Sequence, residues 1–227
     1  YINSFGYGLI DSSFVNNATT DNCGIATIKL NVGDTLRCSD VQTTLSGGFL
    51  PVTVTFTDIH NNDSTCVSRV RVIDNINPKA VAKNLTAPID AAGLAVITPA
   101  MLDGGSYDNC MPLDSIWVDP DTLTCANIGD NNVWLFVQDN SGNRDSVLAS
   151  VSVQDLFPPT IVLQNPIQFS LGSDGYHVVN PAVDIDGGST DNCSSQLTYS
   201  ASIDTVWCDD RVSGVSFSFR VTDGYGN

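Results

Sequence analysis

Six of the seven cysteines stand in three pairs with identical spacing, and this pattern constrains the fold more than any other feature of the chain. In every pair the second Cys follows the first by 15 positions, and successive first members are 87 and then 83 positions apart. An internal period of this length predicts a tandem array of similar small domains. The pairs are Cys23 and Cys38, Cys110 and Cys125, and Cys193 and Cys208.

The residues around the cysteines repeat as well. An Asp-Asn-Cys triplet ends at the first Cys of each pair, at 21–23, 108–110 and 191–193. An Asp-Gly-Gly-Ser run precedes the second and third triplets, whereas Asn16-Asn17-Ala18-Thr19 stands at that place before the first. Matches at several separate places argue against chance, so the three segments are repeats of one domain type.

Strand patterns follow each Cys pair. Segments 52–58 and 215–223 alternate apolar and polar side chains, which indicates strands with one buried face, and 133–139 is the corresponding strand with two apolar faces. A turn and a further strand come next, at 66–73 or 147–154, and this predicts a hairpin. About 80 residues with about seven short strands fit an immunoglobulin-like sandwich. The predicted fold class is therefore all-β, with tandem immunoglobulin-like β-sandwich domains arranged end to end.

The predicted domain boundaries fall at proline-containing links. Asp74 to Pro78 and Asp155 to Pro159 are short and stiffened by proline. They define a first repeat at 1–74, a middle repeat at 75–155 and a third repeat at 156–227. The first repeat lacks its first strand and the third lacks its last. We expect a longer array, and the alternative is a strand supplied by a neighbouring subunit.

The charge of the chain excludes some partners. Lys and Arg number 9 against 25 Asp and Glu, which gives a net charge of -16. Nucleic acids and anionic membranes both require a basic surface, so neither is expected as a partner. The balance favours a cation partner or simply a self-repelling surface. No apolar run approaches the roughly 20 residues of a membrane span.

The cysteines predict disulfides and an oxidising compartment. Paired cysteines in a β-rich chain indicate a secreted or outer-surface location, and each 15-residue loop would stabilise its domain by roughly 3 kcal/mol. Zinc is the weaker alternative because only His60 and His177 could complete a four-ligand site. The predicted bridges are Cys23–Cys38, Cys110–Cys125 and Cys193–Cys208.

Cys66 has no counterpart in the other repeats, and Val147 stands at its place in the middle repeat. It is in phase with Val70 and Val72, so its side chain is expected to point into the core. Two interpretations remain open. Its partner could lie on the absent first strand, or it could be a buried free thiol that packs like a small apolar side chain.

Acidic segments are expected to converge at each junction between repeats. In this sandwich type, two loops of a domain lie at the end that faces the preceding domain, where the linker also arrives. Calcium takes six to eight oxygen ligands and would bridge such carboxylates, whereas the competing interpretation is that Asp and Asn only form turns. The candidate ligands are Asp74, Asn75, Asn77, Asp103, Asp108, Asp139 and Asn143 at the first junction, Asp155, Asp186, Asp191 and Asp223 at the second, and Asp21 and Asp58 in the first repeat.

No catalytic motif is recognisable, and the chain is not expected to be an enzyme. His60 and His177 lack a neighbouring nucleophile motif, and no phosphate-binding loop is present. Trp117, Trp134 and Trp207 fall on strand-like stretches, where we expect them to pack in the core.

The repeat resembles the HYR-like and related immunoglobulin-like repeats of giant surface proteins of Bacteroidetes. The resemblance covers essentially the whole chain and is based on 186–193, the 15-residue Cys step, 137–143 and 72–78. The missing Asp-Gly-Gly-Ser run in the first repeat and the lack of a third Cys in the middle repeat depart from it. In that group an Asp-Ser/Thr-apolar triplet is an O-glycosylation acceptor, which the resemblance implies for Thr35, Thr122 and Thr205.

The resemblance implies a secreted adhesin or an extracellular filament. We therefore expect a structural or adhesive segment, a rod of repeats with calcium-stiffened joints, whose partners are neighbouring repeats or further copies of the protein. A carbohydrate- or protein-binding adhesin module and a non-catalytic appendage of a secreted hydrolase are the alternatives.

Overall fold

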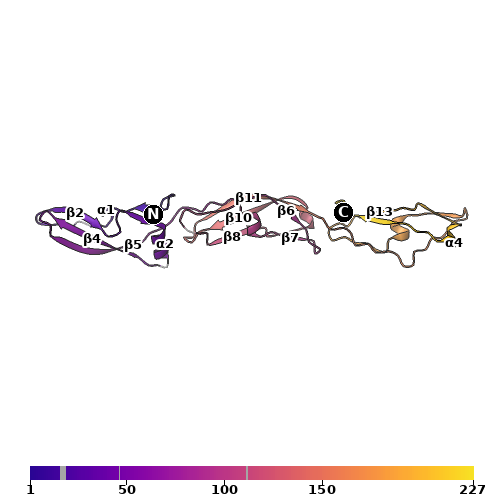
Figure 1. Cartoon of the computed structure of the whole chain (residues 1–227), viewed down its shortest axis with the longest axis horizontal. Helices are drawn as coiled ribbons and strands as arrows, with labels where there is room; N and C mark the ends of the chain where they lie inside the picture. Colours follow the sequence, from indigo (N-terminus) through magenta and orange to yellow (C-terminus); the bar gives the residue numbers. More distant parts are fainter. Residues whose placement is uncertain (16–18, 46, 111) are drawn as a thin grey trace. The chain divides into compact units, whose positions relative to one another are not determined.

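The computed structural model describes residues 1–227 except 16–18, 46 and 111, so Asn16 and Asn17 lie outside the described residues (Figure 1). The described part of the chain consists of β-strands with a few short helices, which confirms the predicted all-β fold class. None of these helices is long and apolar enough to cross a membrane.

The chain forms two compact units. The first unit comprises 1–83, 98–119 and 134–149, and the second comprises 84–97, 120–133 and 150–227. The middle repeat contributes to both units. The division into repeats at 1–74, 75–155 and 156–227 stays a prediction, and we keep the repeat names for these ranges.

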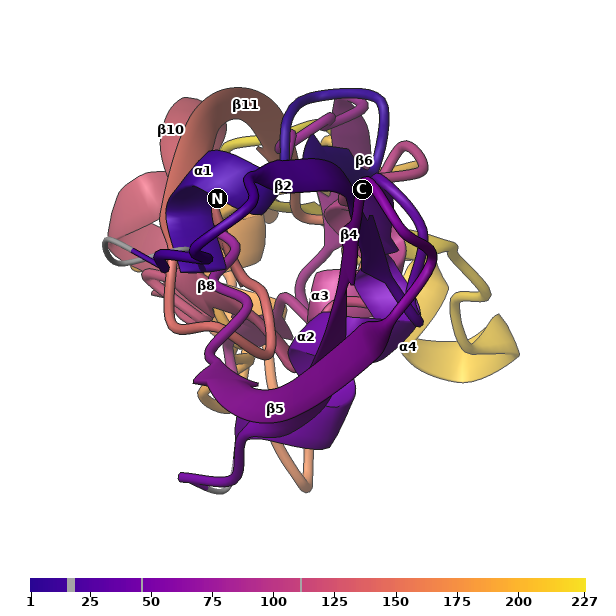
Figure 2. The same ribbon diagram turned by 90° about the vertical axis from the view of Figure 1, so that its left-hand side faces the viewer.

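The first unit contains a three-stranded antiparallel sheet with the order β2-β4-β5, seen end-on in Figure 2. Its central strand buries Val52, Val54 and Phe56 on alternate positions, as the sequence pattern predicts. A second core of the same repeat consists of Ile2, Leu36, Val41 and other apolar residues. The elements are β1 (Tyr7–Leu9), α1 (Ser12–Val15), β2 (Ile25–Leu30), β3 (Thr35–Arg37), α2 (Cys38–Leu45), β4 (Leu50–Asp58) and β5 (Asp63–Val70).

The middle repeat contains a four-stranded sheet with the order β6-β11-β10-β8. β8 pairs antiparallel with β10 in the first unit, and β6 pairs parallel with β11 in the second. In β10, Val133, Leu135 and Val137 are fully buried on one face. The elements are β6 (Leu85–Pro88), β7 (Leu94–Val96), α3 (Pro99–Leu102), β8 (Ser115–Asp119), β9 (Thr122–Thr124), η1 (Cys125–Asn127), β10 (Gly129–Gln138) and β11 (Arg144–Gln154).

The third repeat is built from two antiparallel strand pairs, β12-β14 and β13-β15, around a core that includes Val179, Ile185 and Val206. The strand predicted at 215–223 forms only over its second half, as β15. The elements are β12 (Tyr176–Val178), the helical turn η2 (Pro181–Ile185), β13 (Thr198–Ala201), β14 (Thr205–Trp207), α4 (Asp210–Ser213) and β15 (Phe219–Thr222).

One hairpin-like unit occurs three times along the chain. The strand pairs β1-β3, β7-β9 and β12-β14 are each preceded by a four-residue turn, at 3–6, 90–93 and 172–175. In each turn the last residue donates its N–H to the carbonyl of the first, over 2.9, 2.9 and 3.1 Å. That last residue has φ near +80°, which favours glycine, and it is Gly6, Gly93 and Gly175 in turn.

Candidate metal centres at the repeat junctions

An Asx turn at the end of β10 fixes the direction of the Asp139 carboxylate. Its Oδ1 accepts the backbone N–H groups of Ser141 and Asn143, both over 2.8 Å, and its Oδ2 accepts the Asn143 side-chain amide. The same amide also donates to the backbone carbonyl of Asp74 over 3.1 Å. Equivalent turns hold Asp58 through Asn62 and Asp223 through Asn227. The Asp-to-Asn spacing in the sequence therefore prepares one carboxylate at the same place in each repeat.

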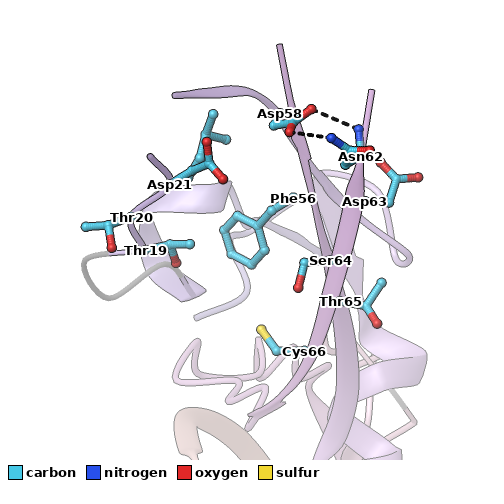
Figure 3. A pocket seen from close by; sticks show the side chains of 11 residues that line it. Thr19, Thr20, Asp21, Phe56, Asp58, Asn62, Asp63, Ser64, Thr65 and Cys66 are labelled. Carbon is cyan, nitrogen blue, oxygen red and sulfur yellow. Dashed lines mark hydrogen bonds between the residues drawn. The ribbon is translucent and has the colours of Figure 1, made fainter. Parts of the chain in front are cut away.

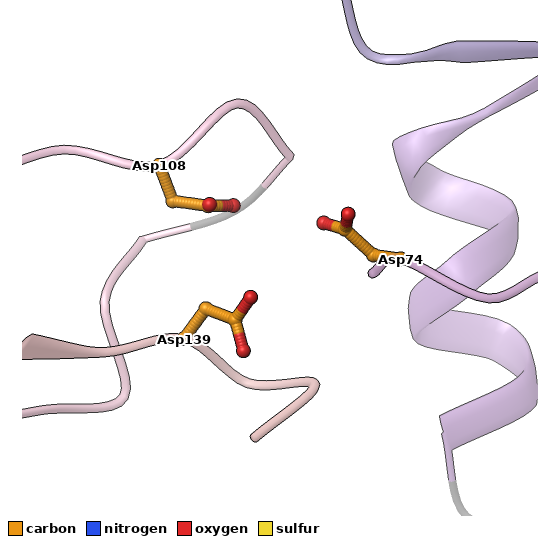
Figure 4. Close-up of side chains that lie close together, drawn as sticks. All are labelled: Asp74, Asp108 and Asp139. Carbon is orange, nitrogen blue, oxygen red and sulfur yellow. The ribbon is translucent and has the colours of Figure 1, made fainter. Parts of the chain in front are cut away.

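Three carboxylates gather at the first junction, all within the first unit. Asp74 comes from the linker after β5, Asp108 from the Asp-Asn-Cys turn and Asp139 from the end of β10, and their side chains converge in Figure 4. One oxygen from each lies within 4.8 Å of the others. Asp74 and Asp139 are only 3% and 2% exposed. Three segments that are far apart in the sequence therefore present acidic oxygens to one small buried volume.

The second junction repeats this arrangement within the second unit. Asp155 from the linker, Asp191 from the Asp-Asn-Cys turn and Asp223 from the Asx turn present oxygens within 4.8 Å of one another. Asp155 and Asp223 are each 5% exposed. The Asn227 amide donates to the Asp155 carbonyl over 3.0 Å, as Asn143 does to Asp74.

The linker aspartates are the electrostatically unfavourable members of the clusters. Burial, and then the charges of Asp108 and Asp139, raise the pKa of Asp74. Burial, and then the charges of Asp191 and Asp223, raise the pKa of Asp155 in the same way. A raised pKa means that these surroundings disfavour the ionised form and that a cation would reverse the effect.

Asp223 shows the opposite shift for a local reason. Burial acts to raise its pKa, but the side-chain amide of Asn227 and the N–H groups of its turn outweigh burial and lower the pKa. This member of the second cluster is thus held in its ionised form by its own turn, while Asp155 opposite it is not.

Several buried oxygens at the junctions accept no hydrogen bond within the described residues. They are Asp155 Oδ2, Asp191 Oδ2, Asn109 Oδ1 and Asn192 Oδ1. Buried polar atoms are normally paired, so unpaired oxygens that surround acidic clusters indicate that a ligand completes them. Carboxylate and amide oxygens are ligands of calcium, and no sulfur or imidazole nitrogen takes part in either cluster. The donor set therefore fits Ca²⁺.

Some predicted ligands have other roles. Asp103 and Asp186 are not members of either cluster, and their role as ligands stays a prediction. Asp103 Oδ1 accepts the N–H groups of Gly105 and Ser106, and Asp186 Oδ1 accepts that of Ser189, so both carboxylates close the Asp-Gly-Gly-Ser turn. Burial acts to raise the pKa of each, and the hydrogen bonds from Ser106 and Ser189 outweigh it and lower the pKa.

The remaining predicted ligands lie around the clusters. Asn143 holds two of the cluster residues by hydrogen bonds, whereas Asn75 and Asn77 are exposed on the linker. In the first repeat, Asp21 and Asp58 line an open pocket of about 430 Å³, into which Phe56 projects (Figure 3). Burial is slight there, and the hydrogen bonds from Asn62 lower the pKa of Asp58.

Cys66 pairs with the buried Val54 and lines the same pocket, but its side chain is exposed, so the prediction that it is part of the core is wrong. Val72, two residues beyond the end of β5, is buried as its place in the pattern predicts. Among the described residues no strand covers this face of the sheet near Cys66, so a side chain on the inner face is still exposed to solvent there.

The disulfides connect different repeats. Cys38 bonds to Cys110 and Cys125 to Cys193, with Cα–Cα distances of 4.9 and 5.2 Å that suit the bond. The predicted bridges Cys23–Cys38, Cys110–Cys125 and Cys193–Cys208 are therefore wrong. The first Cys of a repeat lies in the Asp-Asn-Cys turn beside the preceding linker, whereas the second follows the hairpin-like unit at the other junction. Among the described residues, Cys23, Cys66 and Cys208 are free.

The tryptophans are less buried than predicted. Trp134 and Trp207 are 44% and 55% exposed. Trp117 stacks on Phe136 at 5.2 Å between ring centroids, and Trp134 lies 6.2 Å from the same ring. These residues occupy the outer face of the β8–β10 pair, because the other face of β10 takes Val133, Leu135 and Val137 into the core. The second apolar face of β10 is thus an aromatic surface.

The threonines of the predicted O-glycosylation triplets occupy equivalent places. Thr35, Thr122 and Thr205 are the first residues of β3, β9 and β14. The hydroxyls of Thr35 and Thr122 donate to the preceding Asp34 and Asp121. Glycosylation of these residues stays a prediction.

Comparisons with known proteins give little beyond this. The chain matches no protein-family model, and no curated protein sequence matches it significantly. Among solved structures it is similar to extracellular cadherin domains 1–4 of protocadherin gamma B7, with 14% sequence identity and a TM-score of 0.28. The match covers 78% of this chain and 54% of that one.

Proposed function

We propose that this chain is a structural and adhesive segment of an extracellular fibre or a long cell-surface protein, in which calcium clamps the junctions between immunoglobulin-like repeats. The observation that carries the proposal is the pair of buried acidic clusters, Asp74 with Asp108 and Asp139, and Asp155 with Asp191 and Asp223. The same three positions of the repeat supply each cluster.

The position of the clusters supports a role in joining repeats. In each cluster one carboxylate belongs to the linker and two belong to loops of the following repeat. An ion bound to all three would restrict the linker relative to those loops. It would also remove the repulsion that raises the pKa of Asp74 and Asp155.

The disulfides support an extracellular location. Such bonds persist in oxidising compartments, so two bridges in a chain of 227 residues favour secretion or display on the outer cell surface. A function without catalysis agrees with the use of the acidic groups in turns and clusters. His177 in β12 contacts Asp184 in η2 over 2.9 Å and forms a local pair with it.

Calcium titration of metal-free protein tests the proposal. We expect heat of binding for two ions per chain and a higher midpoint of thermal unfolding, and a weaker response to magnesium, which tolerates crowded protein ligands poorly. The variants Asp139→Asn and Asp223→Asn should each remove one of the two sites, because each keeps its turn but loses a charge. An unfolding midpoint that is unchanged between calcium and chelator would overturn the proposal.

A second candidate function rests on the aromatic surface of the β8–β10 pair. Trp117, Trp134 and Phe136 lie side by side, and the Arg144 guanidinium lies 5.7 Å from the Trp117 ring centre. Sugar rings stack on surfaces of this kind, so we propose carbohydrate binding as the alternative. Glycan-array binding that disappears in Trp134→Ala but persists in Leu148→Ala, another exposed residue, would favour it.

A further inference from the structure

We propose that Cys208 and Cys23 are the two halves of a third bridge of the same kind, so that the third repeat of one copy docks on the first repeat of another copy. The inference rests on the proposed joining function but not on calcium. The two existing bridges are built from the same two local structures.

In each existing bridge one cysteine lies in the same local structure, which we call the donor half. The Cys follows the second strand of a hairpin-like unit, and its sulfur lies against the glycine that closes the four-residue turn. A Cβ placed on Gly6 would lie 3.0 Å from Cys38 Sγ, and one on Gly93 would lie 2.9 Å from Cys125 Sγ. The glycine thus makes the space that the sulfur occupies.

The other cysteine of each existing bridge lies in an Asp-Asn-Cys turn, which we call the acceptor half. The Asp carboxylate accepts the N–H of the Cys, over 2.8 Å at Asp108 and 2.9 Å at Asp191. The Asn side chain reaches across the junction: Asn109 donates to the carbonyl of Asn3 over 3.4 Å, and Asn192 to that of Asp90 over 3.0 Å.

The backbone of the same Asn packs against the donor half as well. The Asn109 carbonyl oxygen lies 3.6 Å from Cys38 Sγ, and that of Asn192 lies 3.5 Å from Cys125 Sγ. The two halves therefore recognise each other by one amide hydrogen bond, one carbonyl contact and the sulfur bond.

The third donor half is already formed and has no acceptor half bound to it among the described residues. The turn at 172–175 is closed like the other two, and a Cβ on Gly175 would lie 3.1 Å from Cys208 Sγ. Cys208 also donates its N–H to the Gly175 carbonyl over 3.0 Å. The Cys208 thiol is exposed and free.

The third acceptor half is formed as well. Asp21 Oδ1 accepts the N–H groups of Cys23 and Gly24, over 2.7 and 2.9 Å, and the Cys23 thiol is exposed and free. Asn22 is exposed at the place of Asn109 and Asn192. When the two halves meet, the Asn22 side-chain amide would donate a hydrogen bond to the Gly172 carbonyl. This carbonyl is the counterpart of the Asn3 and Asp90 carbonyls in the existing bridges.

Bond formation needs an oxidant, and a small disulfide such as oxidised glutathione supplies it. The Cys23 thiolate attacks that disulfide, forms a mixed disulfide and releases one glutathione thiolate. The Cys208 thiolate of the other copy then attacks the Cys23 sulfur and releases the second. Two protein thiols lose two electrons and two protons, and one oxidised glutathione becomes two reduced molecules.

The test uses the complete chain with Cys66→Ser, so that the exposed thiol outside the junctions is absent, in oxidised glutathione with and without chelator. We expect dimers and longer multimers on non-reducing gels, with Cys23 joined to Cys208 in the linked peptides. The multimers should be lost in both Cys23→Ser and Cys208→Ser, and should form more slowly in Asn22→Ala. Their formation in chelator would separate this inference from the calcium proposal.

Three results would overturn the inference. The chain could remain monomeric with both thiols glutathionylated, or the bridges could join Cys23 to Cys23 and Cys208 to Cys208 as often as Cys23 to Cys208. In the chain that keeps Cys66, bridges to Cys66 could be as abundant as those between Cys23 and Cys208. The last two results would show reactive thiols without a docking preference.

Discussion

At the scale of single residues, Asp74 and Asp155 are the cluster members that a bound cation would stabilise most. Each is buried, and neighbouring carboxylates add to the effect of burial on its pKa. A buried charge without a partner is destabilising, whereas the same charge on a metal ion is a ligand. The effect of removing such a residue should therefore change sign with calcium.

Asp155→Asn tests this sign change. In metal-free buffer we expect the unfolding free energy of the variant to exceed that of the parent by on the order of 1 kcal/mol, because the repulsive charge is gone. The variant should therefore unfold at a higher denaturant concentration. In calcium it should be less stable than the parent, because the ion loses a ligand. Asp174→Asn, at an exposed turn, is the control and should change neither value. Equal effects in both buffers would contradict the assignment.

The pH dependence of the same pair follows from the raised pKa of Asp155. Below its ordinary value of 3.8 the carboxyl is protonated in both the folded and the unfolded chain and costs nothing. As the pH rises through the folded pKa, the unfolded chain releases its proton more readily, so the parent loses stability. The advantage of Asp155→Asn in metal-free buffer should therefore grow with pH, as denaturant unfolding between about pH 4 and pH 7 would show.

The sequence could predict the cluster residues but not all of their roles. Asp108, Asp139 and their counterparts recur at fixed places in the repeat, and the fold type places those loops together. Asp103 recurs as Asp186 in the third repeat, yet its carboxylate closes its own turn. Recurrence reveals that a side chain has a constant role and cannot distinguish a metal ligand from a turn former, because both use the same oxygen atoms.

At the scale of elements, the four-residue turn before each hairpin-like unit determines where the disulfides can form. Gly6, Gly93 and Gly175 combine a positive φ with close contact to a sulfur atom. Such glycines are spaced like the cysteines in the sequence, which is the signal that could have indicated the bridges between repeats. The 15-position step pointed to bridges within repeats instead. Sequence spacing alone does not reveal at which end of the domain each cysteine lies, and the two cysteines of one repeat lie at opposite ends.

Gly93→Ala tests the packing role of this turn. The change forces a side chain into positive φ and brings its Cβ within 2.9 Å of Cys125 Sγ. Gly142→Ala is the matched control, since Gly142 has φ of +90° and no neighbour within 4 Å of the added atom. We expect the control to lose about 1 kcal/mol from backbone strain and Gly93→Ala to lose clearly more, measured by denaturant unfolding. Equal losses would show that the sulfur contact is unimportant.

The strands themselves were largely predictable. β4 and β10 show the expected period of two, and β4 extends from Leu50 to Asp58 around the predicted 52–58. The outer face of β10 was not predictable, because Trp134 and Phe136 are as apolar as core residues. Whether an apolar face is covered depends on a second layer of structure, which a single strand sequence does not describe.

At the scale of the whole chain, each junction has a disulfide and an acidic cluster that share one turn. The Asp-Asn-Cys turn at 108–110 supplies a carboxylate to the cluster and a sulfur to the bridge, and 191–193 does the same. Each bridge restricts the other end of the turn that the ion would bind. We therefore expect the two connections to support each other.

Removing the bridge at the second junction tests this coupling. The double variant Cys125→Ser, Cys193→Ser should lose about 4 kcal/mol of unfolding free energy, because the sequence separation closed by the bridge is 68 residues. It should also bind calcium more weakly at that junction, as measured by calorimetry. Cys66→Ser is the control and should leave both quantities unchanged. Unchanged calcium affinity in the double variant would show that the two connections are independent.

The order of the cysteines in the bridges also determines what happens when the chain is pulled. Tension that enters at Cys38 can pass through the first bridge to Cys110, along 15 positions to Cys125, and through the second bridge to Cys193. Between the two bridges this covalent path consists of the segment 110–125, which can extend to about 50 Å at most. The segments 39–109 and 126–192 lie outside it, so while both bridges hold, the strands they contain are shielded from the pulling force and cannot be drawn out.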